Sequence, residues 1–109
     1  MNSCKTEDAD GLRLVRVTGE VDMSWSQDLR KEILDAMAKG SAVGVDLSAV
    51  TYMDSSGIAA LVEGFQQSRS SKSRFALIAP SDAVRSVLEL ARLDRVFPIV
   101  ESAAAARGD

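Results

Sequence analysis

The sequence predicts a single α/β domain over residues 1–109, in which a mixed sheet combines an N-terminal hairpin with parallel strands connected by helices. Two observations lead to this prediction. After two initial strand-like segments, strand and helix patterns alternate along the chain, which is typical of parallel strands joined by right-handed crossovers. Hydrophobic residues make up 46% of the chain, enough for a core, and no long linker or internal repeat divides it.

The N-terminal segments are expected to form the hairpin. Residues 2–7 are weakly patterned, and the stretch DADG at 8–11 ends in an Asp-Gly turn signal. Residues 12–19 alternate between apolar and polar side chains, as a half-buried strand does. The stretch GEVDM is then expected to turn the chain.

A first helix is predicted directly after this turn. Ser24 and Gln27 match the S-x-x-Q capping box, in which side chains satisfy the free backbone N–H groups at a helix start. Gly40 is a natural terminator at the other end. The apolar stripe of this helix recurs every four residues and consists of Trp25, Leu29, Ile33 and Met37.

The middle of the chain reads as strand, helix and strand. Residues 42–50 are apolar and β-branched, as expected for a central strand. Residues 68–73 form a polar connector, and residues 74–80 form a short apolar strand that is covered on both faces. Between the two strands, helical spacing relates Ile58, Leu61, Val62 and Phe65.

The C-terminal part is expected to add one helix, one edge strand and a frayed last helical turn. Pro80 and Ser81 end the preceding strand and cap the helix. Residues 95–102 form the final strand, and Pro98 places it at an edge of the sheet. The apolar stripe of the helix consists of Val84, Val87, Leu88 and Ala91.

Composition excludes most routes to enzymatic chemistry. The chain has no histidine and one cysteine, Cys4, so it can form neither a Ser-His-Asp triad nor a zinc site of the usual kind. It also lacks a phosphate-binding loop of the nucleotide hydrolases. We therefore expect no enzyme, no metal and no cofactor.

Charge and hydropathy indicate a cytoplasmic protein. The net charge is −3 and the basic residues are scattered, which argues against direct nucleic-acid binding. No apolar run approaches the roughly 20 residues that span a bilayer, and the N-terminus does not resemble a signal peptide, so membrane insertion is not expected.

The stretch MDSSG at 53–57 has two interpretations. Asp and Ser are good helix caps and Gly eases a tight turn, so the stretch can be purely structural. The turn also lies at the carboxyl edge of the predicted sheet, where α/β folds place their sites. A helix N-terminus tolerates negative charge, so a phosphate on a serine there would be accommodated and could repel a docked partner.

The helix that follows carries a second feature, a face of small side chains. Gly57, Ala60, Gly64 and Ser68 gather on one side of it, away from the apolar stripe. Such a face lets another backbone approach closely. The approaching element is either a partner protein or a neighbouring element of the same domain, and the sequence alone favours neither.

Three stretches resemble those of a known family. The segment VDLSAVTYMDSSGIAALVEGFQQSR is similar to the characteristic region of STAS domains, specifically of bacterial anti-sigma factor antagonists. The stretch VTGEVD at 17–22 resembles the family's Gly-Glu-x-Asp turn, and VLELARLDRVFPIVES at 87–102 resembles its C-terminal run. The resemblance extends over nearly the whole chain.

The resemblance implies a partner-switching protein. In that family the antagonist binds an anti-sigma factor, a serine kinase of the GHKL type, and thereby releases a sigma factor. The kinase then phosphorylates the serine before the glycine of the turn, and a PP2C-type phosphatase reverses this. Carried over, the resemblance assigns phosphorylation to Ser56. Asp54 and Ser55 flank it, and Asp22 matches the acid of the turn near the docking surface. With the small-residue face as a partner contact, the positions expected to bind a partner are Asp22, Asp54, Ser55, Gly57, Ala60 and Gly64.

Other functions remain open at this point. STAS-like domains also act as accessory subunits of lipid-transport ABC systems and as parts of stress-sensing assemblies, where the same turn is a docking surface without phosphate. An enzymatic or ligand-binding role at the turn is a further alternative. One departure from the family is Trp25, which stands where small residues are common; its place in the helical stripe favours a core position over a partner contact.

Overall fold

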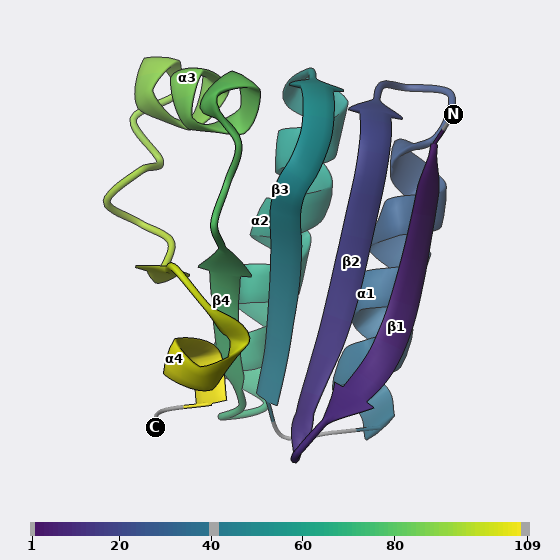
Figure 1. Ribbon diagram of the computed structural model, residues 1–109, viewed down its shortest axis with the longest axis vertical. Helices are drawn as coiled ribbons and strands as arrows, with labels where there is room; N and C mark the ends of the chain where they lie inside the picture. Colours follow the sequence, from purple (N-terminus) through teal and green to yellow (C-terminus); the bar gives the residue numbers. More distant parts are fainter. Residues whose placement is uncertain (1, 40–41, 108–109) are drawn as a thin grey trace.

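The computed structural model describes residues 2–39 and 42–107 and has an α/β architecture with one mixed sheet (Figure 1). The described elements, in chain order, are β1 (Ser3–Ala9), β2 (Leu12–Val21), α1 (Ser26–Lys39), β3 (Ala42–Met53), α2 (Ser55–Ser70), β4 (Arg74–Ile78), α3 (Asp82–Leu90), β5 (Ile99–Val100) and α4 (Ala103–Arg107). The strand order is β1-β2-β3-β4-β5. β1 is antiparallel to β2, and every later pair is parallel, which confirms the predicted fold class.

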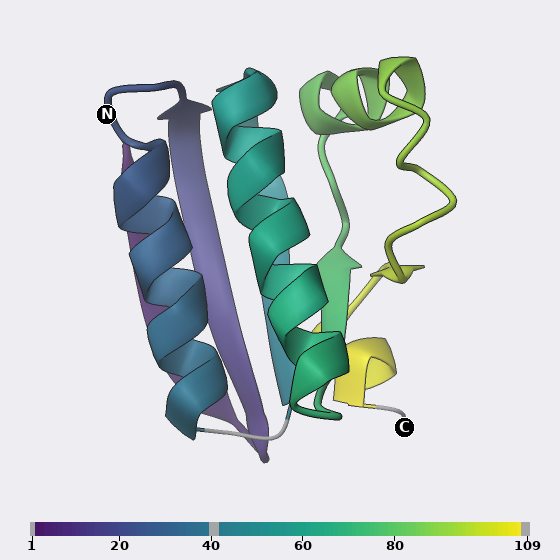
Figure 2. The same cartoon turned by 180° about the vertical axis from the view of Figure 1, so that it is seen from behind.

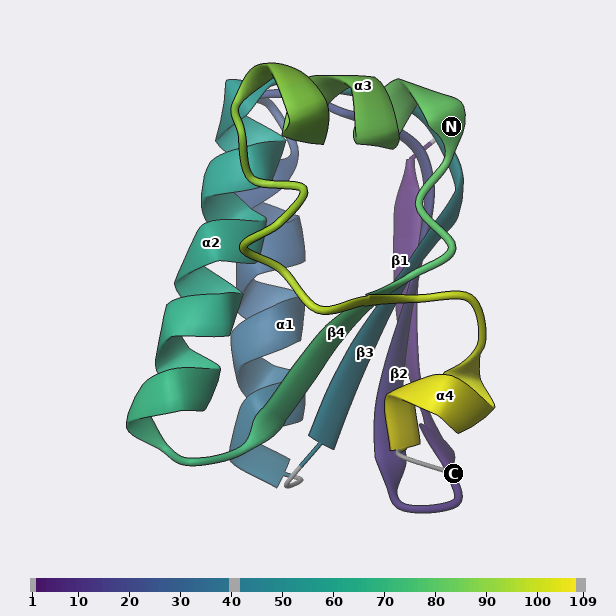
Figure 3. The ribbon, with the colours of Figure 1, turned by 90° about the vertical axis from the view of Figure 1, so that its left-hand side faces the viewer.

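The helices cover the sheet unequally. α1 and α2 lie side by side over one face (Figure 2). Figure 3 shows the short α4 on the opposite face and α3 across the end where the parallel strands finish. The main core therefore lies between the sheet and the pair α1 and α2, and a smaller cluster lies beneath α4.

The N-terminal hairpin forms as predicted, around a two-residue turn. Asp10 has a φ of 53° and Gly11 a φ of 92°, the left-handed conformations that a tight hairpin turn of this kind requires. The Asp8 carboxylate accepts the Gly11 N–H at 3.2 Å. The Asp-Gly pair therefore sets the hairpin register.

Several elements extend beyond their predicted ends. β2 continues through Gly19, which has a φ of 91° within an irregular stretch of the β2–β3 register, and ends at Val21. β3 continues to Met53 and α2 to Ser70, so the first residues of the predicted connector are helical. β4 ends earlier than predicted, at Ile78. Residues that favour turns thus lie inside β2, where pairing with β3 continues, and inside the last turn of α2.

The predicted capping box at the start of α1 is wrong. The Ser24 hydroxyl donates to the Asp22 carboxylate at 2.6 Å, and the helix begins only at Ser26. The backbone carbonyl of Asp22 accepts the N–H groups of Trp25 and Ser26. Asp22, and not Ser24, therefore accepts the first backbone N–H groups at the start of α1. Gly40, the predicted terminator, lies outside the described residues.

The C-terminal elements follow the prediction more closely. Ser81 caps α3, with its hydroxyl oxygen accepting the Val84 N–H at 3.3 Å. β5 lies at the sheet edge directly after Pro98, but it is much shorter than expected and pairs only with Leu77 and Ile78. In the part of the chain that the structure describes, no strand therefore lies beside the first residues of β4.

Candidate functional site

Two turns meet at the carboxyl ends of β2 and β3. The β2–α1 turn contains Asp22 and the β3–α2 turn contains Asp54. A direct hydrogen bond joins them, since the Asp54 N–H donates to the Val21 carbonyl at 3.1 Å. The turns lie at the upper end of the sheet in Figure 1. This is the sheet edge at which α/β folds commonly place their sites.

Asp54 caps α2 with its side chain. One carboxylate oxygen, Oδ1, accepts the backbone N–H of Ser56 at 2.9 Å and that of Gly57 at 3.4 Å. The same oxygen accepts the Ser56 hydroxyl at 2.5 Å. The Ser56 hydroxyl, followed by these backbone N–H groups, holds the pKa of the Asp54 carboxyl below its usual range. The cap is therefore charged at neutral pH.

The two adjacent serines differ in their surroundings. Ser55 is the first residue of α2 and is exposed. Ser56 is half-buried, and its hydroxyl is oriented by Asp54. A carboxylate with a lowered pKa is a weak base, so Asp54 positions this hydroxyl without activating it as a nucleophile. Ser56 is therefore an oriented, partly exposed hydroxyl next to a charged carboxylate.

Asp22 forms a similar turn beside the first one. Its Oδ1 accepts the Ser24 N–H at 3.0 Å as well as the Ser24 hydroxyl. The next residue, Met23, has 78% of its surface exposed. Met23 is not predictable as a site residue from the sequence, because hydrophobic periodicity identifies buried positions and gives no signal for an apolar side chain exposed on a turn.

The small-residue face of α2 packs inside the domain. Gly57, Ala60, Gly64 and Ser68 are all buried. A Cβ atom at Gly57 would lie 2.7 Å from Met53 and 2.9 Å from Val21, and one at Gly64 would lie 2.7 Å from Ile33. The close approach is therefore made by β2, β3 and α1. Of the two interpretations of this face, the structure thus favours packing within the domain over partner contacts at Gly57, Ala60 and Gly64.

Trp25 lies beside these turns and belongs mostly to the core. It is half-buried and packs against the main hydrophobic cluster. Its position agrees with the core interpretation of the helical stripe. Of the residues predicted for the site, the structure thus brings together Asp22, Asp54, Ser55 and Ser56.

Two other kinds of feature that could indicate a function are metal-binding clusters and membrane spans. Within residues 2–39 and 42–107, no group of three or more histidine, cysteine or acidic side chains is arranged to hold a metal ion. In the same part of the chain, no helix has the length and apolar character needed to cross a bilayer.

The fold and the paired turns define a class of protein: a small α/β domain that presents an oriented serine hydroxyl at a strand–helix turn. A family model, that of the STAS domain, matches residues 3–106. The chain belongs to the STAS domain family.

Several proteins to which the chain is similar are named as anti-sigma factor antagonists. The anti-sigma-B factor antagonist of Listeria monocytogenes is 30% identical over 97 residues, which cover 87% of this chain and 83% of that protein. The crystal structure of an anti-sigma factor antagonist from Mycobacterium paratuberculosis has a TM-score of 0.88 at 29% identity and covers 99% of this chain and 92% of its own. The Bacillus cell fate determinant SpoIIAA in its phosphorylated form shares the fold, with a TM-score of 0.74 at 19% identity over 97% of both chains.

Proposed function

We propose that this protein is an anti-sigma factor antagonist that binds an anti-sigma factor with serine kinase activity and is released when that kinase phosphorylates Ser56. The observation that carries the proposal is the Ser56 hydroxyl, half-buried at the start of α2 and held at 2.5 Å by Asp54. The names of the Listeria and Mycobacterium relatives support the same class of function.

Phosphorylation of Ser56 would change the surface without requiring new folding. The phosphate brings about −1.5 to −2 charges and replaces the hydroxyl proton that Asp54 accepts. The new charge would lie against the Asp54 carboxylate and near the Asp22 turn. A partner that covers this surface would have to desolvate those charges together, which is costly for groups without an opposite charge. We expect the modified protein to dissociate for this reason.

The docking surface in this proposal consists of the two turns, with Asp22, Asp54 and Ser55 at its polar contacts. Met23 adds an exposed apolar side chain between them. A PP2C-type phosphatase would remove the phosphate and restore binding. In this scheme the whole chain, 1–109, acts as one cytoplasmic domain, is the substrate of an enzyme and not an enzyme itself, and touches neither nucleic acid nor membrane.

A binding assay with a GHKL-type serine kinase from the same organism tests the proposal. We expect a complex by size-exclusion chromatography without ATP and its dissociation after ATP addition, with one phosphate on Ser56 by fragment mass spectrometry. Ser56→Ala should stay bound in the presence of ATP, and Ser56→Asp should bind poorly from the start.

Ser55→Ala is the matched control for the phosphate, because Ser55 directly precedes Ser56 but its hydroxyl is not the one that donates to Asp54. Even if the lost polar contact weakens the complex, this variant should still take up one phosphate on Ser56 and dissociate after ATP addition. A phosphate that maps to another residue while Ser56 stays unmodified would rule out the assignment. Co-purification with an ABC transporter ATPase in place of a kinase would instead favour a role as a transporter accessory subunit.

A further inference from the structure

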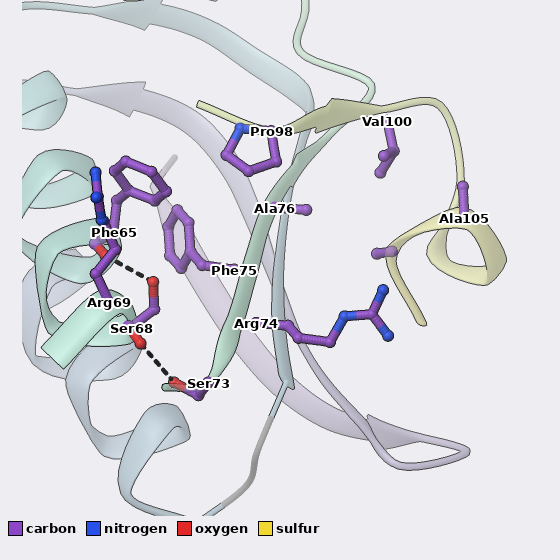
Figure 4. Close-up of a pocket in the computed structure, with 11 residues that line it drawn as sticks. Phe65, Ser68, Arg69, Ser73, Arg74, Phe75, Ala76, Pro98, Val100 and Ala105 are labelled. Carbon is purple, nitrogen blue, oxygen red and sulfur yellow. Dashed lines mark hydrogen bonds between the residues drawn. The ribbon is translucent and has the colours of Figure 1, made fainter. Parts of the chain in front are cut away.

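A cavity of about 360 Å³ lies at the outer edge of β4, at the end of the sheet opposite Ser56 (Figure 4). α2 borders it on one side, and β5 and α4 border it on the other. Apolar groups form most of its wall, among them Phe65, Phe75, Pro98, Val100 and Ala105. The proposed switch at Ser56 uses none of these residues.

The cavity exists because β5 is too short to cover β4. β5 pairs with Leu77 and Ile78, so none of the described residues forms a strand beside the outer edge of Arg74–Ala76. The N–H of Leu77 donates to the Pro98 carbonyl at 2.8 Å. Alternate residues of a strand direct their amide groups to the same side, so the backbone amide of Phe75 faces this open edge.

The rim of the cavity is positively charged although the chain as a whole has a net charge of −3. Arg69 and Arg74 contribute to the lining, and no acidic side chain does among the described residues. Figure 4 shows Arg69 on the α2 side and the Arg74 side chain extending towards α4. Both residues are exposed, and neither forms a salt bridge with a carboxylate in the part of the chain that the structure describes.

Aromatic rings supply the apolar part of the wall. The centroids of Phe65 and Phe75 lie 6.1 Å apart, and the Arg69 guanidinium lies 5.9 Å from the centre of the Phe65 ring. Arg74 is held in place by donating to the Arg107 carbonyl at 2.8 Å. An apolar surface, two guanidinium groups and an open strand amide therefore surround one cavity.

We propose that this cavity binds a small organic carboxylate with an apolar or aromatic body. The body contacts Phe65, Phe75 and Pro98, and the carboxylate lies at the rim beside Arg74 and the Phe75 amide. Arg69 stays on the α2 side, next to the Phe65 ring (Figure 4). A cavity of about 360 Å³ is within the size range of small-molecule sites. This site is separate from the Ser56 turn, and the proposal does not depend on the function proposed there.

Titration with 4-phenylbutanoate, followed by amide NMR, tests the proposal, with the neutral 4-phenylbutan-1-ol as the comparison. The carboxylate should bind with a dissociation constant on the order of millimolar, as expected for about twelve non-hydrogen atoms. Its chemical shift changes should gather at Arg69, Phe75 and Ala76. The alcohol should bind at least tenfold more weakly.

Two pairs of variants separate the site from non-specific binding. Ala105→Trp places a large ring on an exposed position of the cavity wall, whereas Ala104→Trp places it on an exposed position outside the wall. We expect the first to abolish binding of the carboxylate and the second to leave it unchanged. Arg74→Gln should weaken binding several-fold, and Arg95→Gln, which changes an exposed arginine elsewhere, should not.

Equal binding of the acid and the alcohol would overturn the proposal, as would shift changes centred on another part of the molecule. Undiminished binding to Ala105→Trp would do the same. Because every variant lies on the surface, its folding can be checked from the same amide spectra, and a folded Ala105→Trp variant gives a decisive result either way.

Discussion

At the scale of single residues, the Asp54 carboxylate combines two tasks. It satisfies the free N–H groups at the start of α2, and it orients the hydroxyl of Ser56. A side chain that only capped the helix would not need the second contact. A phosphoacceptor that was not oriented would sample several rotamers. Because the Oδ1 atom of Asp54 performs both tasks, a substitution of Asp54 affects the hydroxyl of Ser56, and a substitution of Ser56 affects the Asp54 carboxylate.

The capping task predicts a loss of stability. Asp54→Ala should lower the free energy of unfolding by about 1 kcal/mol, because the N–H groups of Ser56 and Gly57 lose their acceptor. Asp54→Asn retains an acceptor oxygen and should lower the free energy of unfolding by only a few tenths of a kcal/mol. Urea denaturation followed by circular dichroism measures both. Equal stability of Asp54→Ala and the unchanged protein would show that the cap contributes nothing.

The orienting task predicts a change in acid titration. The Ser56 hydroxyl is the largest cause of the lowered Asp54 pKa. A lowered pKa stabilises the fold above the unfolded value, about 3.9, and this stabilisation is lost as the pH falls through the folded value. Ser56→Ala should therefore raise the Asp54 pKa, as measured by carbon NMR of the carboxyl group. Ser55→Ala should leave that pKa where it is.

At the scale of elements, α2 is fitted to its neighbours by its small residues. Its Gly64 lies so close to α1 and β4 that a Cβ atom would be 2.7 Å from Ile33 and 3.1 Å from Phe75. Real Cβ atoms do not approach buried side chains so closely. The glycine therefore serves packing between α1 and α2, although glycine disfavours a helix by up to about 1 kcal/mol.

This packing predicts a strong effect of a larger side chain. Gly64→Val should lower the free energy of unfolding by about 1–3 kcal/mol, because Ile33 and Phe75 must move to admit it. Ala59→Val, at an exposed position of the same helix, should cost only about 0.5 kcal/mol through helix propensity. Thermal or urea denaturation compares the two. Similar losses for both variants would contradict the close fit.

The elements also show how far sequence patterns reach. Alternation, short apolar runs and helical spacing, together with turn signals at the N-terminal hairpin, predict the described strands and helices in the right order, because burial determines the apolar patterns. The ends are less predictable. Gly19 reads as a turn but lies within β2, since that strand continues to pair with β3 as far as Val21. Ser24 reads as a cap but donates to Asp22, and nothing local to Ser24 indicates that competitor.

At the scale of the whole molecule, the two proposed sites lie at opposite ends of the sheet. The turns with Ser56 lie at the carboxyl ends of the parallel strands, and the charged cavity lies where β4 begins. Ser56 and Asp54 could be predicted from their motif, because a capped strand–helix turn is a local structure. The close packing of Gly57 and Gly64 could not, because only the tertiary structure shows which side chains lie against them.

This separation predicts that phosphorylation of Ser56 acts locally. A phosphate at the start of α2 gains about 0.3–1 kcal/mol from the helix dipole, and it loses the Asp54 hydrogen bond and faces its charge. The free energy of unfolding should therefore change by less than about 1 kcal/mol. Amide shift changes should be confined to the two turns around Asp22 and Asp54, with β5 and α4 unaffected.

Amide NMR and urea denaturation of the protein carrying phosphoserine at position 56 measure both quantities. Ser56→Ala provides the reference for loss of the Asp54 hydrogen bond without added charge, so the difference between the two proteins isolates the effect of the phosphate. Shift changes that reach β5, or a stability change above about 2 kcal/mol, would mean that phosphorylation rearranges the fold. Release of a partner would then come from a conformational change, and the local charge and desolvation at the turns would no longer account for it.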